Sequence, residues 1–265
     1  MFVEISVAMT YDTAKGDPAL LAIEVAETQG QTVVRSALDV PKAKLKRIDS
    51  AFGVGQRIWA MGTGSLLTVK YSATVDVVRD DVALETLGAT PLHLLRAEAL
   101  EYLRPSRFCQ SDLFVDFVEQ QFGGLRGGAK AAAILDWVHT QTSYVSGSST
   151  STTTATDTFF SRQGVCRDFA HLACSLLRAA HIPARYVSGY GLHVQPSDFH
   201  AVVQVWLDGA WRICDATGMC LPSEFVVIAT GRDAADVAFM ETSQSAQCVA
   251  QEVAVAKSRQ QNMSG

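Results

Sequence analysis

The sequence has little charge, little proline and no long apolar run. Of its 265 residues, 18% are charged and only 7 are proline. Its 22 Lys and Arg are outnumbered by 27 Asp and Glu, so the basic excess typical of nucleic-acid binders is missing. No apolar run reaches the length of a membrane span, and residues 1–6 lack the basic and apolar segments of a secretion signal. We therefore expect a soluble, cytoplasmic protein with neither a nucleic acid nor a membrane as partner.

The cysteine count is ambiguous, with six cysteines at positions 109, 166, 174, 214, 220 and 248. An even count without a secretion signal is poor evidence for disulfides, so free, metal-binding or catalytic thiols are expected. A metal site would draw on Cys214, Cys220, His193 and His200, which fall in one region. They form no Cys-x-x-Cys or His-x-x-x-His pair of the kind that zinc sites use. We therefore predict neither a metal nor a cofactor.

The residue pattern changes near residue 90. Short strands rich in Val, Ile, Thr and aromatics are predicted at residues 2–7, 20–25, 32–40, 57–61 and 65–78. Helical spacing of apolar residues follows at 92–103, 113–122 and 131–138, and the Ser- and Thr-rich residues 142–158 are typical of a loop. We predict a β-rich, sandwich-like domain over residues 1–90 and a second domain over residues 91–265.

Cys166 has the position of a nucleophile. Apolar residues recur at helical spacing after Gly164, so Cys166 begins a predicted helix. The unpaired N–H groups at a helix start favour the thiolate, and the Cys166 backbone N–H can face an oxyanion. The alternative is that Cys166 is one more small buried apolar residue, which is the usual role of a free cysteine.

His200 and Asp215 are predicted to share one face of a hairpin. Asp208 and Gly209 are typical of a two-residue turn, and that turn sets Val202 opposite Asp215. Because alternate residues of a strand share a face, His200 and Asp215 then project to the same side, where the carboxylate can orient the imidazole. A register change of one residue would separate them. Taken singly, Asp215 also fits a turn cap and His200 a polar strand end.

Together, the segments around these residues resemble a known family. They read LRPSRFC (103–109), GVCRDFAHL (164–172), IPARYVSGY (182–190), HA (200–201), DATG (215–218) and GRDAADV (231–237). In this order they are similar to the bacterial transglutaminase-like superfamily. The resemblance implies an α+β fold, in which a papain-like core packs the helix of the nucleophile on an antiparallel sheet. It also implies Cys166 as nucleophile, His200 as general base and Asp215 as the residue that orients His200.

The resemblance implies acyl transfer from a peptide or amide to Cys166, with a peptide or protein as substrate. Hydrolysis of the acyl-enzyme is the favoured outcome, as in a cysteine peptidase or amidase. The first alternative is transfer of the acyl group to an amine, which would crosslink proteins. The second alternative is that the protein binds or scaffolds a partner without turnover. Arg167 stands where Gln is common in the family and Ala216 where Pro is usual, so substrate preference stays open.

Four residues near Cys166 are candidates for supporting roles. Gln163 and Tyr144 are candidate partners of the Cys166 backbone N–H in binding the oxyanion. Asp168, in the first turn of the predicted helix, is expected to complement the helix dipole rather than act as a catalytic acid. His171 follows Cys166 by about one helical turn, so it could lie beside the site, but a structural role on the helix fits its position at least as well.

Overall fold

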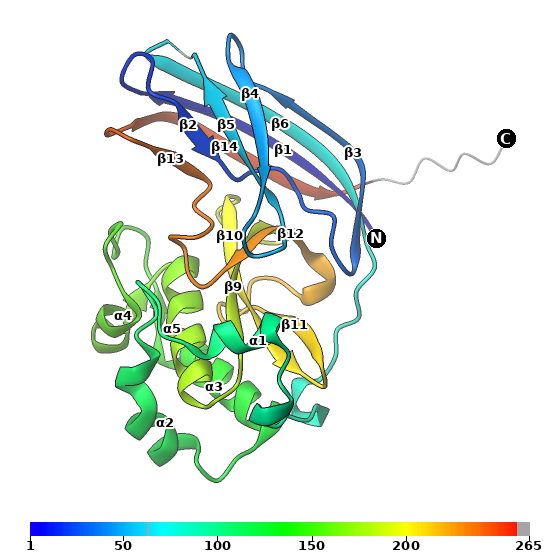
Figure 1. The fold of residues 1–265 in the computed structure, drawn as a ribbon, viewed down its shortest axis with the longest axis vertical. Helices are drawn as coiled ribbons and strands as arrows, with labels where there is room; N and C mark the ends of the chain where they lie inside the picture. The colour runs from blue at the N-terminus through cyan, green and yellow to red at the C-terminus, as the bar shows by residue number, and fades with distance from the viewer. Residues whose placement is uncertain (63, 259–265) are drawn as a thin grey trace, which may run out of the picture.

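The computed structural model describes residues 1–62 and 64–258, which form a β-rich unit stacked on a mixed helix and sheet unit (Figure 1). The β-rich unit contains two antiparallel sheets with the strand orders β14-β1-β6-β3 and β13-β2-β5-β4. Their strands are β1 (Phe2–Asp12), β2 (Ala19–Leu21), β3 (Gln31–Asp39), β4 (Lys44–Asp49), β5 (Gln56–Met61), β6 (Leu66–Val77), β13 (Met240–Thr242) and β14 (Gln247–Lys257). Along β1, buried residues such as Val3, Ile5 and Val7 alternate with exposed ones and share an apolar cluster with Ile58 of β5. This alternation is typical of a β-sandwich.

The end of the chain returns to the sandwich. Strand β14 pairs with β1 and strand β13 with β2. Residues 240–257 therefore lie in the sheets of the N-terminal unit, which corrects the assignment of all of residues 91–265 to one catalytic domain. Sequence patterning missed β14 because it is an edge strand, in which Val253 is the one fully buried residue. The boundary near residue 90 stays a prediction, and residues 259–265 lie outside the described part.

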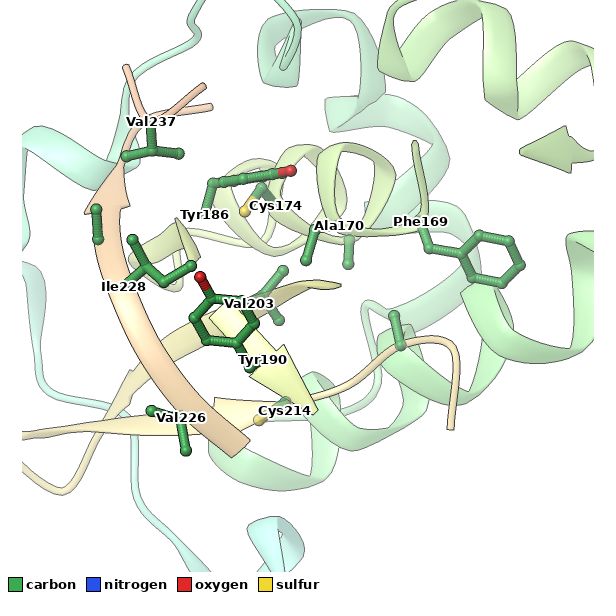
Figure 2. Close-up of a cluster of buried hydrophobic side chains, with 14 of the residues drawn as sticks. Phe169, Ala170, Cys174, Tyr186, Tyr190, Val203, Cys214, Val226, Ile228 and Val237 are labelled. Carbon is green, nitrogen blue, oxygen red and sulfur yellow. The ribbon is translucent and has the colours of Figure 1, made fainter. Parts of the chain in front are cut away.

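The second unit is built on an antiparallel sheet with the strand order β11-β10-β9-β12. Its strands are β9 (Ala184–Gly191), β10 (Phe199–Leu207), β11 (Ala210–Cys214) and β12 (Phe225–Gly231). Helix α5 (Cys166–Ala179) packs on this sheet, and Figure 2 shows Ala170 and Cys174 of α5 in one apolar cluster with Tyr186 and Val203 of the strands. The predicted α+β class, with the helix of Cys166 on an antiparallel sheet, is confirmed.

Most of the other helices lie between the sandwich and α5 along the chain. They are α1 (Ala97–Leu100), α2 (Val115–Phe122), α3 (Gly127–Gln141) and α4 (Ala155–Ser161), with 3₁₀ turns at η1 (Leu84–Thr86), η2 (Leu92–Leu94), η3 (Glu101–Leu103), η4 (Ser111–Phe114) and, after β11, η5 (Pro222–Glu224). Within residues 1–62 and 64–258, no helix combines the length and the apolarity needed to cross a bilayer.

The continuous helix predicted over residues 92–103 is wrong. The segment forms η2, α1 and η3 instead, with extended backbone at Leu95 and Arg96. Tyr102 leaves helical geometry (φ −88°, ψ 17°) and meets the ring of Trp211 edge to face, with 5.3 Å between ring centroids. Packing against β11 therefore overrides the helical spacing of the apolar residues.

Part of the Ser- and Thr-rich segment 142–158 is helical, although a loop was predicted throughout. Strand β7 (Ser143–Tyr144) pairs in parallel with β8 (Gln163–Gly164), and α4 begins within the segment. The Thr154 N–H donates to Asp157 Oδ2 at 2.9 Å and the Asp157 N–H donates to Thr154 Oγ1 at 3.3 Å. This capping box stabilises a helix start in a segment whose composition is typical of a loop.

The hairpin of β10 and β11 has the predicted register. Asp208 and Gly209 both have positive φ, at 49° and 69°, as a type I′ turn requires. Leu207 pairs with Ala210 and Val203 with Cys214, so position 202 lies opposite position 215. The turn therefore places His200 and Asp215 as the sequence predicted.

Candidate active site

Cys166 is the first residue of α5 and is partly exposed. The Val165 N–H donates to Asp168 Oδ2 at 2.9 Å, which caps the helix start. A Cβ at position 164 would lie 2.7 Å from the Asp168 Cβ, so only glycine fits before the capped turn. The helix N-terminus thus presents the Cys166 thiol and its backbone N–H at the surface, where both can reach a substrate.

His200 and Asp215 form a buried pair. His200 Nε2 lies 2.8 Å from Asp215 Oδ2, and the two side chains are 0% and 3% exposed. The other ring nitrogen, Nδ1, is buried and has no hydrogen bond of good geometry among the described residues. Because Asp215 occupies Nε2, the nitrogen left for the Cys166 thiol is Nδ1.

Asp215 is held in place by the turn that follows it. Its Oδ1 accepts from the Thr217 N–H at 2.8 Å and from Thr217 Oγ1 at 2.7 Å, and its Oδ2 also accepts from the Cys220 N–H at 3.1 Å. The sequence left two roles open for Asp215, and its carboxylate fills both, because it caps the turn and binds His200. The sequence analysis did not predict that Thr217 and Cys220 would hold Asp215, although the Asp-x-Thr spacing is a signal of such a turn.

The partners of His200 favour its charged form. Burial lowers the pKa of His200, but hydrogen bonding with Asp215 and then with the Cys166 thiol outweighs burial and raises the pKa to about 9. The Cys166 thiol is therefore close enough to His200 to act on its protonation, even though the resting contact at Nδ1 lacks good hydrogen-bond geometry. Such contacts commonly tighten when substrate binds.

The structure brings Tyr144 to Cys166 but leaves Gln163 apart from it. Strand β7 carries Tyr144 beside Gly164, and the Tyr144 hydroxyl interacts with both the thiol and the backbone of Cys166. Burial, followed by the charge of Cys166, raises the pKa of Tyr144 to about 12, so Tyr144 stays a neutral donor. Gln163 is exposed, and no hydrogen bond of its side chain to Cys166 occurs in the described residues.

Asp168 and His171 have structural roles. Asp168 is fully buried and pairs with Arg167 at 3.1 Å while it caps α5. The fully buried His171 accepts from the Ala234 N–H through Nε2 at 3.1 Å and stacks on Phe108 with 5.1 Å between centroids. Asp168 thus adds a capping hydrogen bond to its expected place at the positive end of the helix dipole, and His171 packs between Phe108 and Tyr186.

The remaining cysteines are set apart from Cys166 by their surroundings. Cys109, Cys174, Cys214 and Cys220 are buried, and Cys248 is exposed on β14. Burial raises the pKa of Cys214 and of Cys220 to about 12, so neither is a thiolate at neutral pH. Over the part of the chain that the structure describes, no three His, Cys, Asp or Glu side chains are grouped to hold a metal ion.

Comparison with known proteins indicates the family of the chain. Residues 117–216, which include Cys166, His200 and Asp215, match the model of the transglutaminase-like superfamily. A candidate cysteine protease of Cytophaga hutchinsonii of known structure is 34% identical, with a TM-score of 0.90 over 97% of this chain and 90% of that chain.

Two mycobacterial relatives match shorter parts of the chain. An uncharacterized protein of Mycobacterium leprae is 30% identical over 184 residues, which are 65% of this chain and 66% of that protein. One of Mycobacterium tuberculosis is 35% identical over 115 residues, or 38% of this chain and 37% of that protein. The chain thus spans just under two thirds of the first relative and little more than a third of the second. The family match and the structural likeness together show that the chain belongs to the transglutaminase-like superfamily.

Proposed function

We propose that this protein is a cysteine hydrolase that cleaves a peptide or amide bond through an acyl-enzyme on Cys166. The observation that carries the proposal is the buried His200–Asp215 pair, with Nε2 and Oδ2 2.8 Å apart, next to a thiol at a helix N-terminus. A buried pair of this kind stabilises an imidazolium, and an imidazolium beside the thiol stabilises the thiolate. The same arrangement in a solvent-exposed hairpin would have little effect on either group.

The chemistry follows from the positions of the three side chains. The Cys166 thiolate attacks the carbonyl carbon, and the oxyanion that forms accepts hydrogen bonds from the Cys166 N–H and the Tyr144 hydroxyl. The imidazolium of His200 gives its Nδ1 proton to the leaving amine as the C–N bond breaks, which leaves a thioester on Cys166. His200 then takes a proton from water, whose oxygen attacks the thioester and releases a carboxylic acid. Asp215 holds the ring at Nε2 throughout.

Water is the proposed acceptor of the acyl group. Cys166 is partly exposed, so water reaches the thioester as soon as the amine leaves. We therefore place hydrolysis before transfer to an amine.

The test is a mass-spectrometric comparison of products. The protein is incubated with a glutamine-containing peptide, with and without a primary amine, and the masses of the products are measured. We expect hydrolysed peptide in both reactions, and no turnover by Cys166→Ala. The matched control is Cys248→Ala, which removes an exposed thiol and leaves turnover unchanged. A predominance of amine adduct would replace hydrolysis by transfer, and full activity of Cys166→Ala would overturn the assignment of the nucleophile.

A further inference from the structure

A cavity of about 1170 Å³ lies apart from Cys166, His200 and Asp215. It is bounded by the sandwich, by α1 and η3, and by one face of the β9–β11 sheet. In Figure 1, α1 lies near β11, and Tyr102 of the following η3 turn contacts Trp211 of β11. None of the residues proposed for catalysis lines the cavity, so it calls for a separate explanation.

The cavity lies on the face of the sheet that α5 does not cover. Tyr186 contacts His171 of α5, with 5.1 Å between ring centroids, so its neighbour Arg185 points to the opposite face. There Arg185 Nε donates to Gln204 Oε1 at 2.7 Å across the β9–β10 pair. Gln204 follows His200 by four residues on β10, about 13 Å along the strand. The cavity and the catalytic pair thus share one strand.

Arg185 is a buried cation without an anionic partner. It is 8% exposed, and its guanidinium lies 4.2 Å from the ring centroid of Trp211. Among the described residues no carboxylate lies within ion-pair distance of it, and its hydrogen-bond partners are the amide oxygen of Gln204 and the hydroxyl of Tyr102. Burial lowers the pKa of Arg185, which is the sign of a charge poorly compensated by its surroundings. A guanidinium carries more N–H donors than these two acceptors use.

The rest of the wall also offers donors rather than acceptors. Five arginines and three carboxylates line the cavity, although the chain as a whole has a net charge of −5. The arginines are Arg79, Arg96, Arg185, Arg212 and Arg232, and the carboxylates are Asp80, Glu98 and Glu101. Two of these arginines have carboxylate partners, since Arg96 pairs with Glu98 and Arg232 with Asp236. Nε1 of Trp206, which is 4% exposed and lies on the same face of the sheet as Gln204, is a buried donor with no acceptor in the described structure.

We propose that this cavity, the Arg185 cavity, binds an organic anion that carries a carboxylate or phosphate group on a flat apolar body. The anionic oxygens would accept hydrogen bonds from the planar, forked guanidinium of Arg185 and from the buried indole N–H of Trp206. The rings of Phe52, Tyr102 and Trp211, which also line the cavity, would contact the apolar body. The volume is ample for a small ligand, since typical small-molecule sites span about 300–1,000 Å³.

The test is calorimetric titration of the full chain with benzoate and with phenyl phosphate at constant ionic strength, and with neutral benzamide for comparison. We expect saturable binding of at least one anion and none of benzamide, and the preferred anion separates a carboxylate site from a phosphate site. Arg185→Gln should weaken binding about tenfold, because it removes a charge-assisted hydrogen bond. The matched control is Arg35→Gln, on the sandwich, where the side chain is 75% exposed and binding should not change.

Because Arg185 is buried, its variant is checked for folding by circular dichroism. If it does not fold, Trp206→Phe, which removes the indole N–H and keeps an aromatic ring, provides the decisive comparison and should also weaken binding severalfold. The proposal is overturned if neither anion binds the wild-type protein at millimolar concentrations, or if benzamide binds as well as the anions. Equal affinity of the folded cavity variants and of Arg35→Gln would overturn it too. None of these outcomes depends on whether Cys166 is catalytic.

Discussion

Replacement of Asp215 by Asn removes the charge beside His200 with little change of shape. The carboxylate accepts from His200 Nε2 at 2.8 Å and from the backbone N–H groups of Thr217 and Cys220 at 2.8 and 3.1 Å. An asparagine of the same size keeps Oδ1 for the two hydrogen bonds from Thr217 and loses the one from the Cys220 N–H. We therefore expect Asp215→Asn to fold, and its effect to fall on the charge state of His200.

The magnitude follows from the pKa of His200. Burial lowers it, yet Asp215 and Cys166 together raise it from 6.5 to about 9. That rise corresponds to about 3 kcal/mol of net stabilisation of the imidazolium, and the carboxylate is its largest favourable cause. The imidazolium is present below pH 9 and is lost as the pH rises through this value. Without the carboxylate, burial dominates, and the pKa of His200 should fall below its ordinary value.

The assay is the rate at which iodoacetamide alkylates Cys166 between pH 5 and pH 9, followed by peptide mass spectrometry. We expect Asp215→Asn to slow alkylation of Cys166 at pH 6 by about 10- to 100-fold, because the imidazolium of His200 is lost. The exposed Cys248 in the same sample is the internal control and should react at the same rate in both proteins. An unchanged pH profile of Cys166 would refute the ion-pair reasoning.

Three further predictions concern the supporting structure. Tyr144→Phe should lower kcat about 10- to 100-fold with little change in KM, measured by steady-state hydrolysis; an unchanged kcat would remove Tyr144 from the oxyanion site. Arg178 is 2% exposed and donates to the carbonyl oxygens of Ala184 and Arg104 at 2.8 and 3.2 Å. Arg178→Leu should therefore lower the free energy of unfolding in urea by about 3 kcal/mol, and a loss below about 1 kcal/mol would contradict this. Gly209→Val, at φ 69°, should lower the free energy of unfolding by about 1–2 kcal/mol, whereas an unchanged melting temperature would argue against strain in the turn.

Local chemistry made the placement of His200 and Asp215 predictable from the sequence. A two-residue turn at Asp208 and Gly209 sets the register of a hairpin, and the register alone places His200 and Asp215 on one face. The helix start at Cys166 follows from Gly164 and the apolar spacing after it. The approach of the thiol to His200 is a tertiary contact between α5 and the sheet, and only the family resemblance pointed to it.

Long-range packing accounts for what the sequence did not predict. The helical spacing at residues 92–103 was overridden when Tyr102 packed on Trp211, more than a hundred residues away in the chain. Strand β14 has too few buried residues to show alternation, so its return to the sandwich depends on pairing with β1. The Arg185 cavity joins segments from the sandwich, α1 and the sheet, and no local pattern indicates their meeting.

The central claim, that Cys166 forms an acyl-enzyme with the help of His200, is tested most directly by trapping that intermediate. The protein is mixed with p-nitrophenyl acetate, quenched in acid within the first turnover, digested and weighed by mass spectrometry. The account predicts an acetyl group on the peptide that contains Cys166, and its loss in His200→Ala. Acetylation confined to Cys248 or to lysines, with release of p-nitrophenol unchanged in Cys166→Ala, would contradict it.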